Sequence, residues 1–207
     1  ALDAKGAGFS FREAIRTRQL WMICLINLIV VFCAVTIMVH IVAHATDIGI
    51  PPTKAATVLA AIGGVSMAGR LLTGFAIDRI GNKKTMVVCF LLLVVSLTWL
   101  LVARDLWMLY LFALVYGLAH GGLFTLISPV VAEHFGMTSH GVLLGLAVFS
   151  GTIGGAIGPF VAGYLFDRMS SYQTAFVLLV VSGIVGLFLT AFLRPIRTSQ
   201  ESQTVKP

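Results

Sequence analysis

Six long apolar stretches decide what this chain of 207 residues can fold into. Each is about as long as the roughly 20 residues that carry an α-helix across a bilayer. Among the 14 Lys and Arg and the 8 Asp and Glu, only Arg70 lies inside one of them. Charged residues make up 11% of the chain, whereas a soluble domain has about 25%. We therefore expect an all-α membrane protein with six transmembrane helices, at residues 21–45, 55–77, 85–103, 107–132, 141–166 and 174–193.

The basic residues predict which helix ends face the cytoplasm. Most Lys and Arg lie in the tails 1–20 and 194–207 or in the connection 78–84, and few lie in the connections on the other side. Cytoplasmic segments of membrane proteins carry the excess of Lys and Arg. Both tails are therefore expected in the cytoplasm. Topology explains the net charge of +6, so nucleic-acid binding is not expected.

The residue patterns favour helix packing over catalysis. The three cysteines lie inside apolar stretches without metal-site spacing, and the glycine run 154–158 follows no strand, so neither a metal ion nor a nucleotide cofactor is expected. Glycines four residues apart let membrane helices approach closely, and Asn27 is expected to hydrogen-bond between helices. The glycine pairs are Gly117 and Gly121, Gly141 and Gly145, Gly151 and Gly155, and Gly154 and Gly158.

The second and fifth stretches end alike. Gly69, Gly74, Asp78 and Arg79 match Gly158, Gly163, Asp167 and Arg168, each at an offset of 89 residues. This offset corresponds to three helices, so the two copies would lie on opposite sides of the membrane. Such an inverted three-plus-three repeat is typical of secondary transporters.

One copy continues into a longer motif, formed by Gly74, Asp78, Arg79, Gly81, Lys83 and Lys84. It resembles the loop signature of the major facilitator superfamily, with Asn82 where a basic residue is usual. The resemblance covers roughly residues 10–195 and implies half of a twelve-helix fold, in a plasma membrane or bacterial inner membrane. It also implies that the loop acts as a gate. The runs 128–141 and 154–167 resemble the tenth and eleventh helices of monocarboxylate and oxalate–formate carriers, which implies the C-terminal half.

Arg70 is the strongest candidate for a substrate contact. A charge near the middle of a membrane helix is costly unless it faces protein or a wet cavity, and Gly63, Ser66, Thr73 and Gly74 share its face. A guanidinium binds a carboxylate through two parallel hydrogen bonds. In the resembled carriers, the arginine eight residues before the loop acid holds the substrate carboxylate, which implies the same for Arg70. A structural arginine that pairs with another helix is the alternative.

Four other polar residues are candidates for the same site. Ser66 precedes Arg70 by four residues, and His40 lies where the resembled carriers offer a histidine. Tyr116 and His120 are four apart beside several glycines, where a ligand could fit, although a histidine that only bonds between helices is the alternative. His44 lies near the outer end of its stretch and is expected to face water.

Three hypotheses for the function follow. The first is the C-terminal half of a secondary transporter of a small monocarboxylate such as lactate, pyruvate or formate, by proton symport or anion exchange. Its partners would be the substrate, protons, the lipid bilayer, and a missing N-terminal half or a second copy. The second is a transporter of another metabolite or drug, with Arg70 structural. The third is a half-size or truncated membrane protein without transport activity. None of them is an enzyme.

Overall fold

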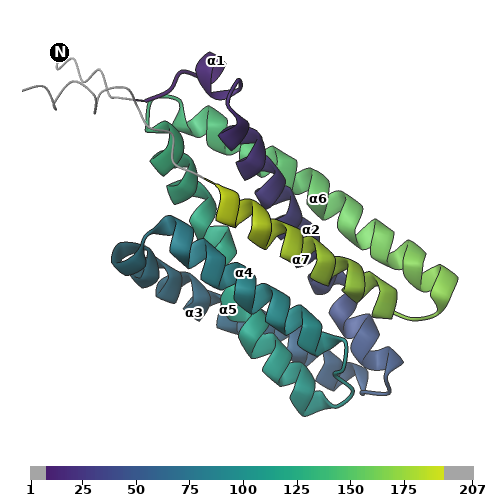
Figure 1. The fold of residues 1–207 in the computed structure, drawn as a ribbon. Helices are drawn as coiled ribbons and strands as arrows, with labels where there is room; N and C mark the ends of the chain where they lie inside the picture. Colours follow the sequence, from purple (N-terminus) through teal and green to yellow (C-terminus); the bar gives the residue numbers. More distant parts are fainter. Residues whose placement is uncertain (1–7, 194–207) are drawn as a thin grey trace, which may run out of the picture.

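The computed structural model describes residues 8–193 and is helical throughout, with no strand in that range (Figure 1). It has one short helix, α1 (Phe11–Ala14), and six long ones, each long and apolar enough to cross a membrane. The long helices are α2 (Arg18–Asp47), α3 (Pro52–Ile80), α4 (Asn82–Leu100), α5 (Leu106–Phe135), α6 (His140–Met169) and α7 (Gln173–Phe192). The expected all-α fold with six spans is confirmed. Helix α4 is displaced by three residues towards the N-terminus, because Leu101–Ala103 form a turn.

Glycine, proline and capping side chains determine where several helices begin and end. Gly49, Gly81 and Gly136 have φ angles of +91°, +83° and +73°, which L-residues with side chains rarely adopt, and each follows a long helix closely. Pro52 opens α3, where its missing N–H costs nothing. Thr17 caps α2 by accepting a hydrogen bond from the amide of Leu20.

The short N-terminal helix was not expected, because it lies in the predicted tail. A capping box holds α1, since the Ser10 hydroxyl accepts from the Glu13 amide and the Glu13 carboxylate accepts from the Ser10 amide. The Phe9 amide donates to the carbonyl of Phe135 at 2.9 Å, and the two rings meet edge to face. This segment is therefore docked on the C-terminal end of α5.

The long helices form two groups that lie side by side in Figure 1. Helices α3 and α4 pack on α5, helices α6 and α7 pack on α2, and α4 against α7 joins the two groups. The two repeats, α2–α4 and α5–α7, can be exchanged helix for helix, so that α2 takes the place of α5, α3 that of α6 and α4 that of α7. The same pairs of helices are then in contact. The α3–α5 contact becomes α6–α2, α4–α5 becomes α7–α2, and α4–α7 becomes itself. The inverted repeat expected from the sequence is thus also present in the packing.

Glycine brings α3 and α5 into backbone contact. A Cβ atom on Gly69 would lie 2.7 Å from the carbonyl oxygen of Leu118, and one on Gly121 would collide with the carbonyl oxygen of Ser66. Gly117 faces the side chain of Val65 equally closely. Three glycines on two helices thus allow the close approach that small residues permit in membranes.

The α2–α6 contact is built in the same way. Cβ atoms on Gly154 and Gly158 would run into the backbone of α2, and the Asn27 side chain donates to the carbonyl of Ala147 at 2.8 Å. Gly141 and Gly145 have nothing within 4 Å. The prediction of helix packing is therefore confirmed for three glycine pairs and for Asn27, and is wrong for Gly141 and Gly145 within the described residues.

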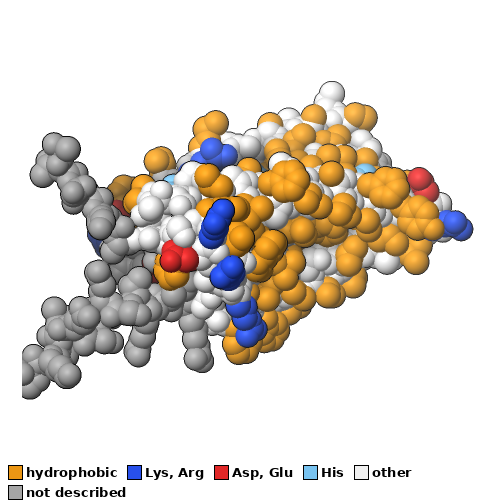
Figure 2. All heavy atoms as spheres, turned by 90° about the horizontal axis from the view of Figure 1, so that it is seen from above, with side chains coloured by type: hydrophobic (Ala, Val, Ile, Leu, Met, Phe, Trp, Pro, Cys, Tyr) orange, Lys and Arg blue, Asp and Glu red, His pale blue; other side chains and the backbone are white. Residues whose placement is uncertain are grey.

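The surface has the pattern of a membrane protein. Figure 2 shows a broad apolar belt with basic side chains along one end and a few charged residues at the other. We call these the basic end, which holds the turn at Gly81, and the far end, which holds the connections 48–51, 101–105 and 170–172. Large apolar side chains such as Met67, Phe75 and Phe160 are exposed on the belt, where lipid or another protein can cover them.

Candidate functional site

Arg70 lies on α3 about four residues past the helix centre, or roughly 6 Å towards the basic end at 1.5 Å per residue. Its side chain is exposed on the described structure, and among residues 8–193 no carboxylate forms an ion pair with it. A cation at this depth is costly without a partner. Arg70 is therefore available to an anion, or to an acidic residue outside the described part of the chain.

Ser66 lies one turn before Arg70 but is turned into the α3–α5 contact. It is 5% exposed, and its hydroxyl donates to the carbonyl of Gly63 at 2.7 Å. Its own carbonyl packs on Gly121. Ser66 thus positions the Arg70 turn of α3 against α5, and its hydroxyl oxygen can still accept a hydrogen bond.

His120 lies next to Gly121, the residue of α5 that meets the Arg70 turn of α3. A Cβ on the neighbouring Gly121 would lie 3.1 Å from the backbone nitrogen of Arg70, so α5 meets α3 beside both residues. The Nδ1 atom of His120 is buried and has no hydrogen-bond partner among the described residues. Since an unpaired buried polar atom is costly, His120 is suited to bonding a polar ligand beside Arg70.

His120 belongs to a row of four rings spaced four residues apart on α5. Ring centroids of Phe112 and Tyr116 are 5.0 Å apart, those of Tyr116 and His120 are 5.9 Å apart, and those of His120 and Phe124 are 4.9 Å apart. Phe112 is fully buried, whereas Phe124 is 39% exposed. The row fixes the plane of the His120 ring.

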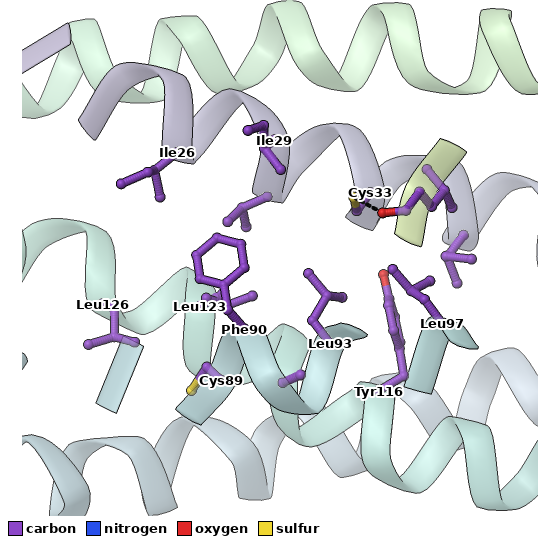
Figure 3. Packing of buried hydrophobic residues seen from close by; sticks show 14 of the residues in the cluster. Ile26, Ile29, Cys33, Cys89, Phe90, Leu93, Leu97, Tyr116, Leu123 and Leu126 are labelled. Carbon is purple, nitrogen blue, oxygen red and sulfur yellow. Dashed lines mark hydrogen bonds between the residues drawn. The ribbon is translucent and has the colours of Figure 1, made fainter. Parts of the chain in front are cut away.

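Tyr116 is not brought to Arg70. The side chain is fully buried, and Figure 3 shows its hydroxyl pointing towards Cys33 on α2, among residues of the core. The hydroxyl has no hydrogen-bond partner in the described structure. The sulfur of Cys33 itself faces the carbonyl of Leu179 at 3.8 Å. Tyr116 therefore supports the His120 ring from the core side.

His40 lies on α2, packed against α6 and the far-end connection. Its Nε2–H donates to the carbonyl of Pro159 at 3.0 Å, and its Nδ1 lies 3.3 Å from the hydroxyl of Tyr172, with which it can share a hydrogen bond. Burial and the nearby carboxylates Asp47 and Asp167 raise the pKa of Tyr172, which keeps this hydroxyl protonated. Both ring nitrogens of His40 are thus engaged within the chain.

His44 does not face water, contrary to expectation. It is 5% exposed and its ring meets those of Tyr172 and Phe176 edge to face. The signal that sequence reasoning missed is the pair of aromatic residues four apart at the start of α7, which covers the end of α2.

The loop motif forms the tight turn between α3 and α4. Gly81 ends one helix and precedes the next, and Asp78 and Arg79 are exposed with no ion pair among the described residues. Lys84 is exposed and Lys83 half-buried, and Gly74 has nothing within 4 Å. The repeat counterparts are Gly158, which packs on α2, Gly163, where an added Cβ would lie 3.8 Å from Cε1 of His40, and the exposed Asp167 at the far end.

Asn82, the departure from the family motif, has a defined partner. Its amide donates to the carboxylate of Glu133 on α5 at 2.7 Å. Sequence reasoning missed this contact, because the two residues are 51 positions apart. The motif turn is therefore attached to α5, the helix that also carries His120.

The fold and the packing of its two halves define a helical membrane protein built as an inverted repeat, as in secondary transporters. Within residues 8–193, no group of three or more His, Cys, Asp or Glu could hold a metal ion.

The chain belongs to the Major Facilitator Superfamily, whose family model matches residues 10–206. It is 29% identical to Monocarboxylate transporter 12 of Mus musculus over 175 residues, which cover 83% of this chain and 36% of the relative. It is 30% identical to Monocarboxylate transporter 13 of Rattus norvegicus over 155 residues, which cover 74% of this chain and 35% of the relative. The chain thus spans about a third of the length of these relatives.

Solved structures of transporters share the fold. The transporter FucP in the outward conformation superposes with a TM-score of 0.75 at 19% identity, over 90% of this chain and 46% of that one. A peptide transporter, POT, in complex with alafosfalin superposes with a TM-score of 0.74 at 14% identity, over 89% of this chain and 42% of that one. At these identities the likeness concerns the fold alone.

Proposed function

We propose that this chain is the C-terminal half of a secondary transporter of a small monocarboxylate such as lactate, pyruvate or formate. Arg70 carries the proposal, because it is a membrane-embedded cation without an anionic partner in the described structure. The similarity to relatives named monocarboxylate transporters supports the substrate class.

In this proposal, the substrate carboxylate binds the Arg70 guanidinium through two hydrogen bonds. His120 completes the site, because its buried Nδ1 can bond the hydroxyl, carbonyl or second oxygen of the substrate. A single arginine matches a monoanion in charge. A direct contact with the substrate stays a prediction for His40, Tyr116 and Ser66. Their hydrogen bonds within the chain and their burial favour a role in positioning the helices around the site.

Glycine placement supports a second body beside this one, either an N-terminal half or another copy. Gly63, Gly64 and Gly74 on α3 and Gly141 and Gly145 on α6 have nothing within 4 Å. Glycine inside a helix costs about 0.5–1 kcal/mol relative to alanine. Helices α3 and α6 are also the least buried of the six. We propose that these faces pack on the second body, with the site between the two.

The proposed mechanism is alternating access, with the basic end in the cytoplasm. The two bodies rock about the bound carboxylate, and the motif turn at Gly81 latches their cytoplasmic ends. Anion exchange needs no titrating group in addition to Arg70. Proton symport would also need a titrating group near Arg70, and we propose His120 or a residue of the second body for it.

The test is uptake of radiolabelled lactate by cells that express the complete reading frame containing this chain. Arg70→Ala should lower uptake at least about tenfold, because hydrogen bonds to a charged group contribute about 1.5–3 kcal/mol each. Arg70→Lys should recover only part of it, since an ammonium lacks the planar fork. Lys54→Gln, which removes an exposed cation from the same helix, should leave uptake unchanged. Undiminished uptake by the Arg70→Ala variant would refute the substrate role.

A ligand screen separates the alternative in which Arg70 is structural. Lactate, pyruvate and formate should raise the Tm of the wild-type protein but not that of Arg70→Ala. If Arg70 is structural, Arg70→Ala lowers the Tm measured without ligand. A substrate of another class should then still raise the Tm of the Arg70→Ala variant.

A further inference from the structure

A groove separates α3 from α4 at the basic end and is distinct from the Arg70 site. It is an apolar cavity of about 150 Å³ that opens on the lipid-facing belt, and α5 forms its floor. An apolar cavity of that size elsewhere stays dry and binds a hydrocarbon ligand. The lining residues are Gly69, Leu72, Thr73, Ala76 and Ile80 of α3, Thr85, Val88, Cys89 and Leu92 of α4, and Leu118 of α5.

The length of the groove matches one leaflet of a bilayer. From Gly69 to Ile80 the groove follows α3 over eleven residue steps, or about 16 Å at 1.5 Å per step. The hydrocarbon core of a bilayer is about 30 Å thick, so one leaflet contributes about 15 Å. The groove is therefore about as long as one leaflet is thick, which is the length of a single acyl chain.

Two basic side chains flank the mouth of the groove. Arg79 lies one turn after Ala76 on α3, and Lys84 lies one turn before Val88 on α4. Both are exposed, and neither forms an ion pair within residues 8–193. At 100° per residue, Asp78 lies on the face of α3 opposite to the groove. Lys83 instead lines a small cavity beside Glu133 on the other side of α4.

We propose that this groove binds one acyl chain of an anionic glycerophospholipid, whose phosphate is held by Arg79 and Lys84. The long aliphatic stems of both side chains can lie along the lipid while their charged ends reach the headgroup. Basic pockets between transmembrane helices bind anionic headgroups in this way. The counterpart of Lys84 in the other repeat, 89 residues later at the far end, is the uncharged Gln173. The far end therefore lacks this basic residue.

Native mass spectrometry of the purified 207-residue chain in detergent tests the proposal, with phosphatidylglycerol and phosphatidylcholine of the same acyl chains as probes. Phosphatidylglycerol should bind about thirtyfold more tightly, the factor expected for two basic side chains near an anionic headgroup. Lys84→Gln should weaken its binding about fivefold, and Lys54→Gln, which removes an exposed lysine at the far end, should not change it.

A second pair of variants tests the groove itself. Val88 and Val95 are both exposed valines of α4, at 47% and 60%, but only Val88 lines the groove. Val88→Trp should fill the groove and abolish the bound lipid, whereas Val95→Trp should leave it. Equal binding by the Val88→Trp and Val95→Trp variants, or by the Lys84→Gln and Lys54→Gln variants, overturns the proposal. Displacement of the lipid by excess glycerol phosphate also overturns it, because the headgroup alone would then account for binding.

Discussion

The backbone contact between α3 and α5 makes a prediction for Gly121→Ala that opposes helix propensity. The added Cβ would meet the carbonyl group of Ser66, with the carbon at 2.9 Å, and the backbone nitrogen of Arg70 at 3.1 Å. These atoms cannot rotate away, because they belong to the backbone of α3. Ordinary Cβ contacts begin at 3.4 Å, so α3 must move away by about 0.5 Å or more.

The size of the effect follows from two opposing contributions. Overpacking costs about 1–3 kcal/mol, and replacing glycine by alanine inside a helix returns about 0.5–1 kcal/mol. The net loss is therefore roughly 0–2.5 kcal/mol, which corresponds to a fall in Tm of up to roughly 10 °C for a chain of this size. Gly64→Ala, where nothing lies within 4 Å, should instead raise the Tm by roughly 1–4 °C.

Thermal unfolding of the 207-residue chain, followed with a thiol-reactive dye, measures both variants. The three free cysteines are all buried, so they react only on unfolding. Gly154→Ala is the matched variant, because its Cβ would meet the backbone of Leu28 and Phe32 in the same way. It should lower the Tm similarly but leave carboxylate binding unchanged, whereas Gly121→Ala should also weaken carboxylate binding. If Gly121→Ala raises the Tm as Gly64→Ala does, the close packing of α3 on α5 is refuted.

Three smaller perturbations address other contacts. Asn27→Ala removes the hydrogen bond to α6 and should lower the free energy of unfolding by about 1 kcal/mol in denaturant titrations. Tyr172→Phe removes the bond to His40 and should cost about 0.5–1.5 kcal/mol by the same measurement. Hydrogen bonds from Ser10 lower the pKa of Glu13 from its ordinary value of 4.5, so the α1 cap is stabilising above that pH and weakens as the pH falls through the lower folded value. The protection factors of the α1 amides, which correct for the intrinsic pH dependence of exchange, should therefore fall as the pH drops through the folded pKa of Glu13. Protection factors that do not change with pH would contradict the assignment.

The sequence predicted the helices and the repeat well, because both depend on patterns that survive without three-dimensional information. A stretch of 20 apolar residues has few alternatives in a membrane, and the matched glycines of α3 and α6 pointed to equivalent packing. The predictions were weaker where the partner of a residue decides its role. Gly141 resembles Gly151 in spacing, yet of the two only Gly151 meets another helix among residues 8–193.

The candidate site shows the same limit. Arg70 is conspicuous in the sequence, because any charge in an apolar stretch requires an explanation. The proximity of His120 depends on the Gly121 contact, and the burial of His44 depends on α7, which no spacing rule reveals. His40 had a polar pattern suited to a ligand, but α6 and the far-end connection already supply bonds to both its nitrogens.

Each repeat contributes its first helix to the group formed by the other repeat, since α5 packs with α3 and α4 and α2 packs with α6 and α7. This arrangement affects the order in which contacts can form during synthesis. Of the six long helices described, α2 is synthesised before the other five, yet its main partner α6 begins at His140, more than ninety residues after α2 ends at Asp47. Until then, Asn27 lacks the carbonyl of Ala147 to which it donates. Helices α3 and α4 likewise cannot form their main packing contacts until α5 has been synthesised. Neither group of helices can be completed by one repeat alone, so we expect a ribosome that stalls between α4 and α5 to release a product that degrades instead of a stable three-helix intermediate.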